Sequence, residues 1–199
     1  MVTYEFSQFS VFPSRIESER LTFIPLHKSD ISVRQMYQKY KDVSKESTKG
    51  VTFEPHTQMI EAKNFIDQSK NSFEEGESGS YIIRESDTGE WIGTTGLSPR
   101  WDRSVMESGI YLFEEYWGNG YGTERGNTFL EITFKEYDMD VWISRCAVDN
   151  EDSRNSIEKY VVGNGGEKCG YLPRMDMNTH VSDAYIYAIT QEEYFSEQD

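Results

Sequence analysis

The run Gly-Asn-Gly-Tyr-Gly at residues 118–122 is the strongest candidate for chemistry in this chain. Glycine at every second position removes the Cβ atoms that would block close approach, so backbone N–H groups can converge on one anion. The run follows an expected strand over 105–113 and precedes an expected helix over 123–137, whose positive dipole end adds to the attraction. The run therefore predicts a seat for a phosphate or pyrophosphate, with an ordinary strand-to-helix turn as the alternative.

Two better-known phosphate motifs do not fit this run. A P-loop requires a lysine followed by serine or threonine after the last glycine, whereas Gly122 is followed by Thr123 and Glu124. A dinucleotide fingerprint has the spacing G-x-G-x-x-G, and the spacing here is G-x-G-x-G. Both motifs are excluded.

The triplet Asp87-Thr88-Gly89 could also carry catalysis, because Asp-Thr-Gly is the catalytic triplet of aspartic proteases. Those enzymes need two carboxylates that share a proton, and this triplet occurs once, among polar and acidic neighbours. Strand-like segments at 80–84 and 91–97 flank it. We therefore expect the triplet to form the turn of a hairpin.

The elements that must position the glycine run alternate between strand-like and helix-like patterns. Apolar spacing predicts helices over about 29–40, 57–75 and 123–137, and another that begins after Asp149-Asn150. Strands are expected at 20–26, 80–84, 91–97, 105–113, 141–148, 167–172 and 181–190. Residues 1–17 form an N-terminal arm and 192–199 a tail in this interpretation. The order predicts one α+β (α/β) domain over 1–199, with a core of about 18–191 and a mixed, largely antiparallel sheet flanked by helices.

Length and composition limit the class of protein. A chain of 199 residues can bury one sizeable core, and an aromatic content of 14% favours a globular protein over a disordered one. No apolar run approaches the roughly 20 residues of a membrane span, and the N-terminus does not resemble a secretory signal, so we expect a cytoplasmic protein. The three histidines match no metal motif, and no metal is expected. Cys146 and Cys169 show no metal or redox spacing, and a disulfide between them stays open.

The net charge of −15 comes from 35 acidic and 20 basic residues. Such a balance argues against nucleic-acid binding, which needs clustered positive charge. The acidity either attracts cationic amines or is a solvated surface adapted to concentrated salt, as in a halophilic host. Because the acids are spread along the whole chain, the second interpretation is favoured. It predicts higher stability in molar salt than in dilute buffer.

Several runs around the glycine loop carry a resemblance to a known family. They are Arg20-Leu21, Trp91-Ile92-Gly93 with Gly96-Leu97, Glu-Ser-Gly-Ile-Tyr-Leu at 107–112, Tyr-Trp-Gly-Asn-Gly-Tyr-Gly-Thr-Glu at 116–124, and Val-Asp-Asn-Glu-Asp-Ser at 148–153. In this order, across residues 18–191, the chain resembles the GNAT acetyltransferase superfamily. It is most similar to the branch that contains the ribosomal-protein N-terminal acetyltransferases.

This resemblance implies an N-acetyltransferase, an acyltransferase that moves the acetyl group of acetyl-CoA to a primary amine and releases CoA. The amine would attack directly in a ternary complex, and it would belong to a protein N-terminus or a small molecule. The resemblance also implies a splayed strand pair that receives the cofactor, and a monomer or homodimer. A non-catalytic acyl-CoA-binding or regulatory module with the same fold is the alternative.

The resemblance also implies the residues that contact the cofactor. Trp117 stands where the family has glutamine or arginine, and Asn150 and Ser153 are equally good as a helix cap and a first-turn residue. The cofactor contacts implied are Tyr111, Leu112, Phe113, Trp117, Gly118, Asn119, Gly120, Tyr121, Gly122, Thr123, Asn150, Ser153 and Asn155.

Catalytic roles are assigned to Glu107, Ser153 and Asn150. Many family members protonate the leaving thiolate with a tyrosine, but Ile157 occupies the matching position here, so Ser153 or a water is the substitute. Glu107 is the candidate general base, with a solvated surface glutamate as the alternative. A backbone N–H near Leu112 would stabilise the oxyanion. The acceptor amine is not identified, because the longer connection at 162–166 replaces the family's usual Gly-Phe.

Overall fold

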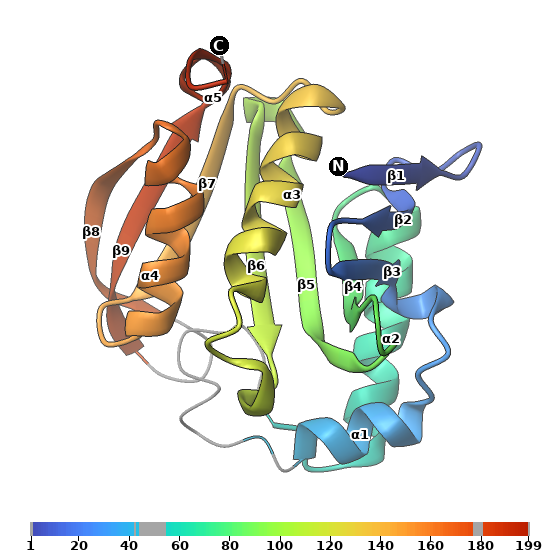
Figure 1. Ribbon diagram of the computed structural model, residues 1–199. Coiled ribbons are helices and arrows are strands. Elements are labelled where there is room, and N and C mark those ends of the chain that lie inside the picture. Colours follow the sequence, from blue (N-terminus) through green and yellow to red (C-terminus); the bar gives the residue numbers. More distant parts are fainter. Residues whose placement is uncertain (1, 42, 44–54, 177–180, 199) are drawn as a thin grey trace.

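The computed structural model describes residues 2–41, 43, 55–176 and 181–198, and in this part of the chain the strands form a single nine-stranded sheet. The sheet order is β1-β2-β3-β4-β5-β6-β7-β9-β8 (Figure 1). The strands are β1 Thr3–Phe6, β2 Pro13–Glu17, β3 Leu21–Pro25, β4 Gly79–Glu85, β5 Trp91–Arg100, β6 Val105–Leu112, β7 Val141–Ala147, β8 Glu167–Asp176 and β9 Val181–Thr190.

Five α-helices belong to the described residues, and they cover both faces of the sheet. They are α1 Val33–Lys41, α2 Met59–Glu74, α3 Tyr121–Lys135, α4 Glu151–Tyr160 and α5 Gln191–Ser196, with short 3-10 turns η1 Leu26–Lys28, η2 Trp101–Arg103, η3 Glu114–Tyr116 and η4 Val162–Asn164. Helices α3 and α4 lie on one face, and α1 and α2 lie on the other (Figure 1). The predicted mixed, largely antiparallel sheet flanked by helices is confirmed.

Two hydrophobic clusters follow from the alternation of side chains along the strands. Tyr81 and Ile83 of β4 pack in a cluster with Phe129 of α3, whereas Ile82 between them packs with Met36 of α1 and Ala62 of α2. Each face of the sheet therefore has its own core. The two cores hold the sheet rigid on both sides of the strands that carry the glycine loop.

All strand pairs are antiparallel except β6 with β7, which are parallel. Their pairing covers only Val105–Glu107 of β6, opposite Val141–Ile143 of β7. Beyond Glu107, β6 stays paired with β5 as far as Leu112, while β7 continues paired with β9. The two strands therefore splay apart, and this gap opens the sheet at its centre.

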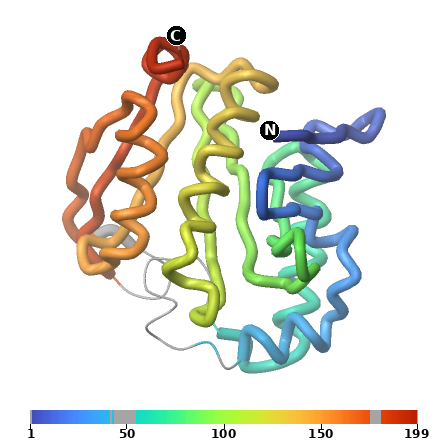
Figure 2. The backbone as a smooth tube through the Cα atoms, viewed as in Figure 1, coloured from blue at the N-terminus to red at the C-terminus, as the bar shows by residue number. Residues whose placement is uncertain are grey.

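The ends of the chain differ from the sequence-based prediction. The predicted arm over 1–17 contains β1 and β2, which extend the sheet beyond β3 because Phe12 and Ile16 are fully buried in the core. The predicted tail begins with α5, where Thr190 and Glu193 form a capping box and Tyr194 packs on Phe134. Figure 2 shows the first and last parts of the chain at opposite sides of the molecule.

Two local predictions, the turn at 87–89 and the helix cap at Asn150, are confirmed. Asp87-Thr88-Gly89 forms the turn between β4 and β5, and the side chain of Asn150 caps α4 by accepting from the Ser153 N–H at 3.0 Å. Cys146 is buried and Cys169 is exposed, and both are free thiols. No helix within the described ranges is long and apolar enough to cross a membrane. In the same ranges, no group of three or more His, Cys, Asp or Glu residues could hold a metal ion.

Candidate active site

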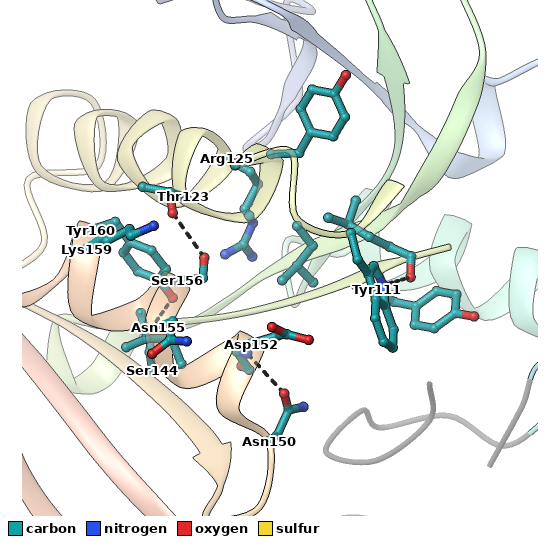
Figure 3. A pocket seen from close by; sticks show the side chains of 18 of the residues that line it. Tyr111, Thr123, Arg125, Ser144, Asn150, Asp152, Asn155, Ser156, Lys159 and Tyr160 are labelled. Carbon is teal, nitrogen blue, oxygen red and sulfur yellow. Dashed lines mark hydrogen bonds between the residues drawn. The ribbon is translucent and has the colours of Figure 1, made fainter. Parts of the chain in front are cut away.

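A cleft of about 630 Å³ opens where β6 and β7 splay apart. Its walls come from the unpaired end of β6, the glycine loop with the start of α3, and the first turns of α4 (Figure 3). The end of β6 can bind a partner through its backbone, because residues beyond Glu107 do not pair with β7. The cleft therefore joins an open strand edge to an anion-binding loop.

The glycine loop has the backbone conformation that its composition predicts. Gly118 and Gly120 have φ angles of +75° and +79°, in the left-handed region that favours glycine. A Cβ atom at Gly122 would lie 2.8 Å from the Ser156 hydroxyl, so α4 could not approach this closely with another residue there. Gly120 is the N-cap of α3, and the free N–H groups of the first helical turn begin here. This cradle suits a pyrophosphate group.

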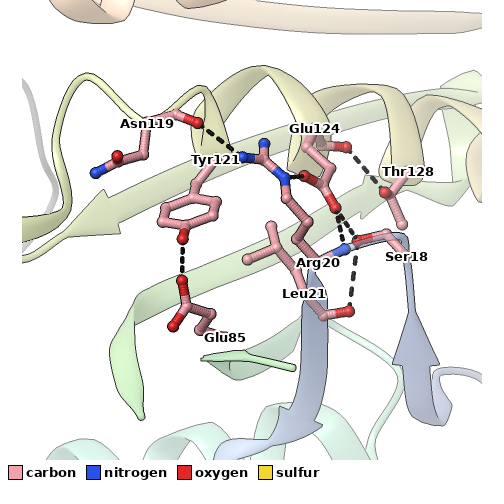
Figure 4. Close-up of polar contacts among 8 residues, drawn as sticks. All are labelled: Ser18, Arg20, Leu21, Glu85, Asn119, Tyr121, Glu124 and Thr128. Atoms are coloured by element: carbon pink, nitrogen blue, oxygen red, sulfur yellow. Dashed lines mark hydrogen bonds and ion pairs between the residues drawn. The ribbon is translucent and has the colours of Figure 1, made fainter. Parts of the chain in front are cut away.

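A polar network holds the glycine loop from behind (Figure 4). Arg20, at the start of β3, donates to the Asn119 carbonyl at 3.0 Å and pairs with Glu124 of α3 at 2.7 Å. Glu124 also accepts from the Ser18 hydroxyl and from the Arg20 backbone N–H. On the loop itself, Tyr121 donates to Glu85 of β4, and this bond lowers the pKa of the Glu85 carboxyl. The network links the loop to the N-terminal half of the sheet.

Helix α4 forms the opposite wall of the cleft with small polar side chains. Asn150, Ser153, Asn155 and Ser156 all line it. Ser156 lies 3.4 Å from the Thr123 hydroxyl, so the two helices that flank the cleft meet at this point (Figure 3). The Ser153 hydroxyl makes no hydrogen bond to another described residue and is available to a bound molecule.

The floor of the cleft is Arg125 of α3, which is 1% exposed. Its guanidinium donates to Thr95 at 2.6 Å, to the Gly109 carbonyl at 2.6 Å, and to Ser108. These acceptors lie on β5 and on β6 just beyond Glu107, where β6 leaves β7. A cation therefore lies at the vertex of the splay.

Tyr160 of α4 lies beside this cation. Its hydroxyl is 2.8 Å from the Ser144 hydroxyl of β7, and burial raises its pKa, which the positive charge of Arg125 partly offsets. Gly126 allows this position, because a Cβ there would come within 2.3 Å of the Tyr160 ring. Both walls of the cleft thus place a polar group at the vertex.

The structure brings most of the predicted cofactor residues to one cleft. Phe113 and Asn119 lie outside the lining: Phe113 packs in the cluster around Tyr40, and the Asn119 side chain donates to the Tyr116 and Trp117 carbonyls. The residues of that set that line the cleft are Tyr111, Leu112, Trp117, Gly118, Gly120, Tyr121, Gly122, Thr123, Asn150, Ser153 and Asn155.

Glu107 does not line the cleft. It lies on the paired part of β6 and accepts from Arg100 at 3.0 Å and from Arg145 at 2.8 Å. Two guanidinium groups therefore occupy this carboxylate. Its role as general base stays a prediction, and from outside the cleft it would have to act through water.

Sequence reasoning missed the polar floor of the cleft. In the sequence, Arg125 resembles any other charged residue of an amphipathic helix. Ser144 and Tyr160 occupy ordinary positions of a strand and a helix. One signal was present: Arg125 falls beside Gly126 on the face that also carries Phe129 and Leu130, where a charged residue breaks the apolar pattern. A charge on a buried face indicates a function more often than a charge on a solvated face.

Comparison with known proteins agrees with this geometry. Residues 20–160 match the acetyltransferase (GNAT) domain family. An uncharacterised N-acetyltransferase, p20 of Bacillus licheniformis, is 22% identical over 179 residues, which is 89% of this chain and 96% of that protein. A second one, YnaD of Bacillus subtilis, is 28% identical over 136 residues, 67% of this chain and 75% of that protein.

Solved structures share the fold. A spermidine N-acetyltransferase from Vibrio cholerae, in complex with CoA and spermine, has a TM-score of 0.70 at 17% identity and covers 89% of this chain and 99% of its own. A ribosomal L7/L12 α-N-protein acetyltransferase in complex with CoA has a TM-score of 0.73 at 16% identity, covering 87% and 95%.

The chain belongs to the acetyltransferase (GNAT) domain family, since the match covers more than half of it. It is an acetyl-CoA-dependent N-acetyltransferase.

Proposed function

We propose that the chain transfers the acetyl group of acetyl-CoA to a primary amine by direct attack within a ternary complex. One observation carries the proposal: the glycine loop, the open edge of β6 and the polar start of α4 line a single continuous cleft. A pyrophosphate on the loop and an extended arm along β6 would bring the thioester to the splay. Binding both substrates in one cleft makes the reaction effectively unimolecular.

The residues of the cleft suit the parts of CoA. The N–H groups at the start of α3 attract the pyrophosphate, and Gly120 leaves room for it. The open edge of β6, near Leu112, faces the amide-containing arm. Asn150, Ser153 and Asn155 line the wall across from this edge.

The chemistry requires a donor for the oxyanion and an acid for the leaving thiolate. The backbone N–H near Leu112 is the proposed oxyanion donor, and Ser153, alone or through a water, is the proposed acid. Asn150 orients the start of α4, because its side chain holds the Ser153 N–H. Glu107 is the proposed base, acting through water.

The acceptor is proposed as a primary amine of a small molecule or of a protein N-terminus. Two structures with this fold are named for such substrates, spermidine in one case and a ribosomal protein N-terminus in the other. The negative net charge of −15 does not oppose the approach of a cationic amine. The run at 148–153 supports a place in the branch of the ribosomal-protein N-terminal acetyltransferases.

The test of cofactor binding is calorimetric titration with acetyl-CoA and with CoA. Gly120→Asp should abolish saturable binding, because it adds a side chain and a negative charge where the pyrophosphate lies. Gly89→Asp is the matched control, since Gly89 also has a positive φ, +72°, and lies in the β4–β5 turn away from the cleft. Equal binding by both variants would contradict the proposed loop.

The test of the acceptor is a panel of amines incubated with acetyl-CoA and followed by mass spectrometry. Polyamines, amino acids, aminoglycosides and short peptides with free N-termini form the panel. An acetylated amine with release of CoA confirms the transfer, and its identity gives the substrate class. Binding of acetyl-CoA with no transfer to any of the four classes would contradict the proposed acceptor.

A further inference from the structure

Arg125 is a buried cation without a carboxylate partner among the residues that the structure describes. Its hydrogen bonds go to neutral groups: the Thr95 and Ser108 hydroxyls and the Gly96 and Gly109 carbonyls. The guanidinium also lies over the Phe129 ring, 4.8 Å from its centroid. Moving a charge from water into the protein interior without a counter-charge costs on the order of several kcal/mol of desolvation free energy. Such a residue is expected to have a function.

The charge persists at neutral pH. Burial lowers the pKa of Arg125 to about 10, and the nearby Tyr160 hydroxyl acts in the opposite direction. The side chain is therefore still protonated in the physiological range. Its field reaches the cleft with little screening, because the protein interior has a lower effective dielectric constant than water.

We propose that Arg125 supplies the positive charge that stabilises the leaving thiolate of CoA. This inference rests on the proposed function, because the thioester must lie in the splay above the guanidinium. The tyrosine that many relatives use as the acid is replaced by Ile157, so the chain stabilises the thiolate by a fixed charge. Arg125 acts through its field and keeps its own proton.

The transfer balances with this role. The amine nitrogen forms a bond to the acetyl carbon, the C–S bond breaks, and its electron pair stays on the sulfur. The proton of the attacking nitrogen passes to water, and the thiolate takes a proton before CoA leaves. Arg125 lowers the energy of the state in which the sulfur is negative.

Arg125 also fixes the place where that charge develops. It joins Thr95 of β5 to Ser108 and Gly109 of β6, and its guanidinium faces the Trp142 ring of β7 at 5.9 Å. It therefore lies between the two strands at the point where they part. The same contacts that keep the splay open keep the cation at its vertex.

Other charged groups around the cleft act on the sulfur less strongly. Those on its lining are Arg145 of β7, Asp149 before α4, and Glu151, Asp152 and Lys159 of α4. Arg145 shares the Glu107 carboxylate with Arg100, and Glu151, Asp152 and Lys159 are exposed, so solvent screens these three. The three acids would raise the pKa of the thiol, so they act against the effect proposed for Arg125.

The experiment is a pH titration of the thiol of CoA bound to the unmodified protein, read from the ultraviolet absorbance of the thiolate. We expect the pKa of the bound thiol to lie about one unit or more below that of free CoA. An unchanged or raised pKa would overturn the proposal without any variant.

Three variants assign the effect to Arg125. Arg125→Met should return the pKa of the bound thiol to that of free CoA or above, and reduce kcat about 10- to 100-fold, with KM for acetyl-CoA within about threefold. Arg125→Lys keeps the charge and should retain most of the lowered pKa. Arg154→Met removes a half-buried arginine of α4 outside the lining and should leave the pKa unchanged.

The outcomes separate this inference from the proposed function. No binding of CoA to the unmodified protein would contradict the proposed function itself. Binding with an ordinary thiol pKa would contradict only the role of Arg125. If Arg125→Met does not fold, the titration of the unmodified protein and of Arg125→Lys still decides.

Discussion

Arg20 and Arg125 both contact elements next to the glycine loop, yet they lie in opposite environments. The Arg20 side chain is 45% exposed and pairs with Glu124, behind the loop (Figure 4). Arg125 is 1% exposed, at the cleft floor, and no carboxylate of the described residues pairs with it (Figure 3). The two regions show one side-chain type in two roles.

The difference follows from solvent. Near the surface, an ion pair is weakened by water and salt, and its value lies in the geometry that it holds. In the interior, the same charge is strong, and it stays charged only because neutral dipoles surround it. Arg20 is therefore suited to shape the loop, and Arg125 to place charge in the cleft.

The largest expected difference is in stability. Arg125→Met removes the buried hydrogen bonds from the guanidinium to Thr95, Ser108 and the Gly109 carbonyl, and we expect the free energy of unfolding to fall by about 1–3 kcal/mol. Arg20→Met removes an exposed pair and should cost less than about 1 kcal/mol. Urea unfolding without CoA measures both, and the reverse order would break the comparison.

The next effect is on the affinity for the cofactor. Arg20→Gln removes the guanidinium that joins the Asn119 carbonyl to Glu124, so the loop loses part of its support, and KM for acetyl-CoA should rise about 3- to 10-fold with kcat within about twofold. Arg15→Gln is the control, because Arg15 pairs with Glu17 at similar exposure on β2. Steady-state kinetics measures both, and a fall in kcat for Arg20→Gln would assign Arg20 a role in the chemical step.

A smaller effect tests whether the fixed charge acts alone. If the Ser153 hydroxyl protonates the thiolate, Ser153→Ala should lower kcat about threefold to tenfold. The loss of a general acid usually lowers kcat more than this, but a water molecule can take the place of the missing hydroxyl. Ser153→Thr, which keeps the hydroxyl, should recover most of the rate. Unchanged turnover of Ser153→Ala would remove Ser153 from the mechanism and leave Arg125 as the main support of the thiolate.

The smallest effect concerns salt. At about 1 M salt the screening length is about 3 Å, so the KM defect of Arg20→Gln should shrink to about twofold or less, whereas the kcat defect of Arg125→Met should persist. Thermal unfolding over the same salt series tests the predicted adaptation of the acidic surface, with sucrose as the uncharged control. Equal stability in dilute and molar salt would contradict the predicted adaptation to salt.

Sequence patterns predicted the elements near the site well, because each has a local cause. Gly118 and Gly120 adopt positive φ angles that favour glycine, and Asn150 is a strong helix cap, so loop and helix appear where expected. The strand at 181–190 was predicted with its observed bounds. The N-terminal strands were missed, since Phe12 and Ile16 are buried only by partners distant in the sequence.

By itself, the sequence determined the family, the glycine loop and part of the cleft lining, because those signals depend on neighbours along the chain. Only the tertiary structure decided which charges matter. Glu107 is held by two arginines and lies off the cleft, while Arg125 is buried at its floor. The strength of a charge depends on the solvent and dipoles around it, and these are set by strands that meet across the sheet.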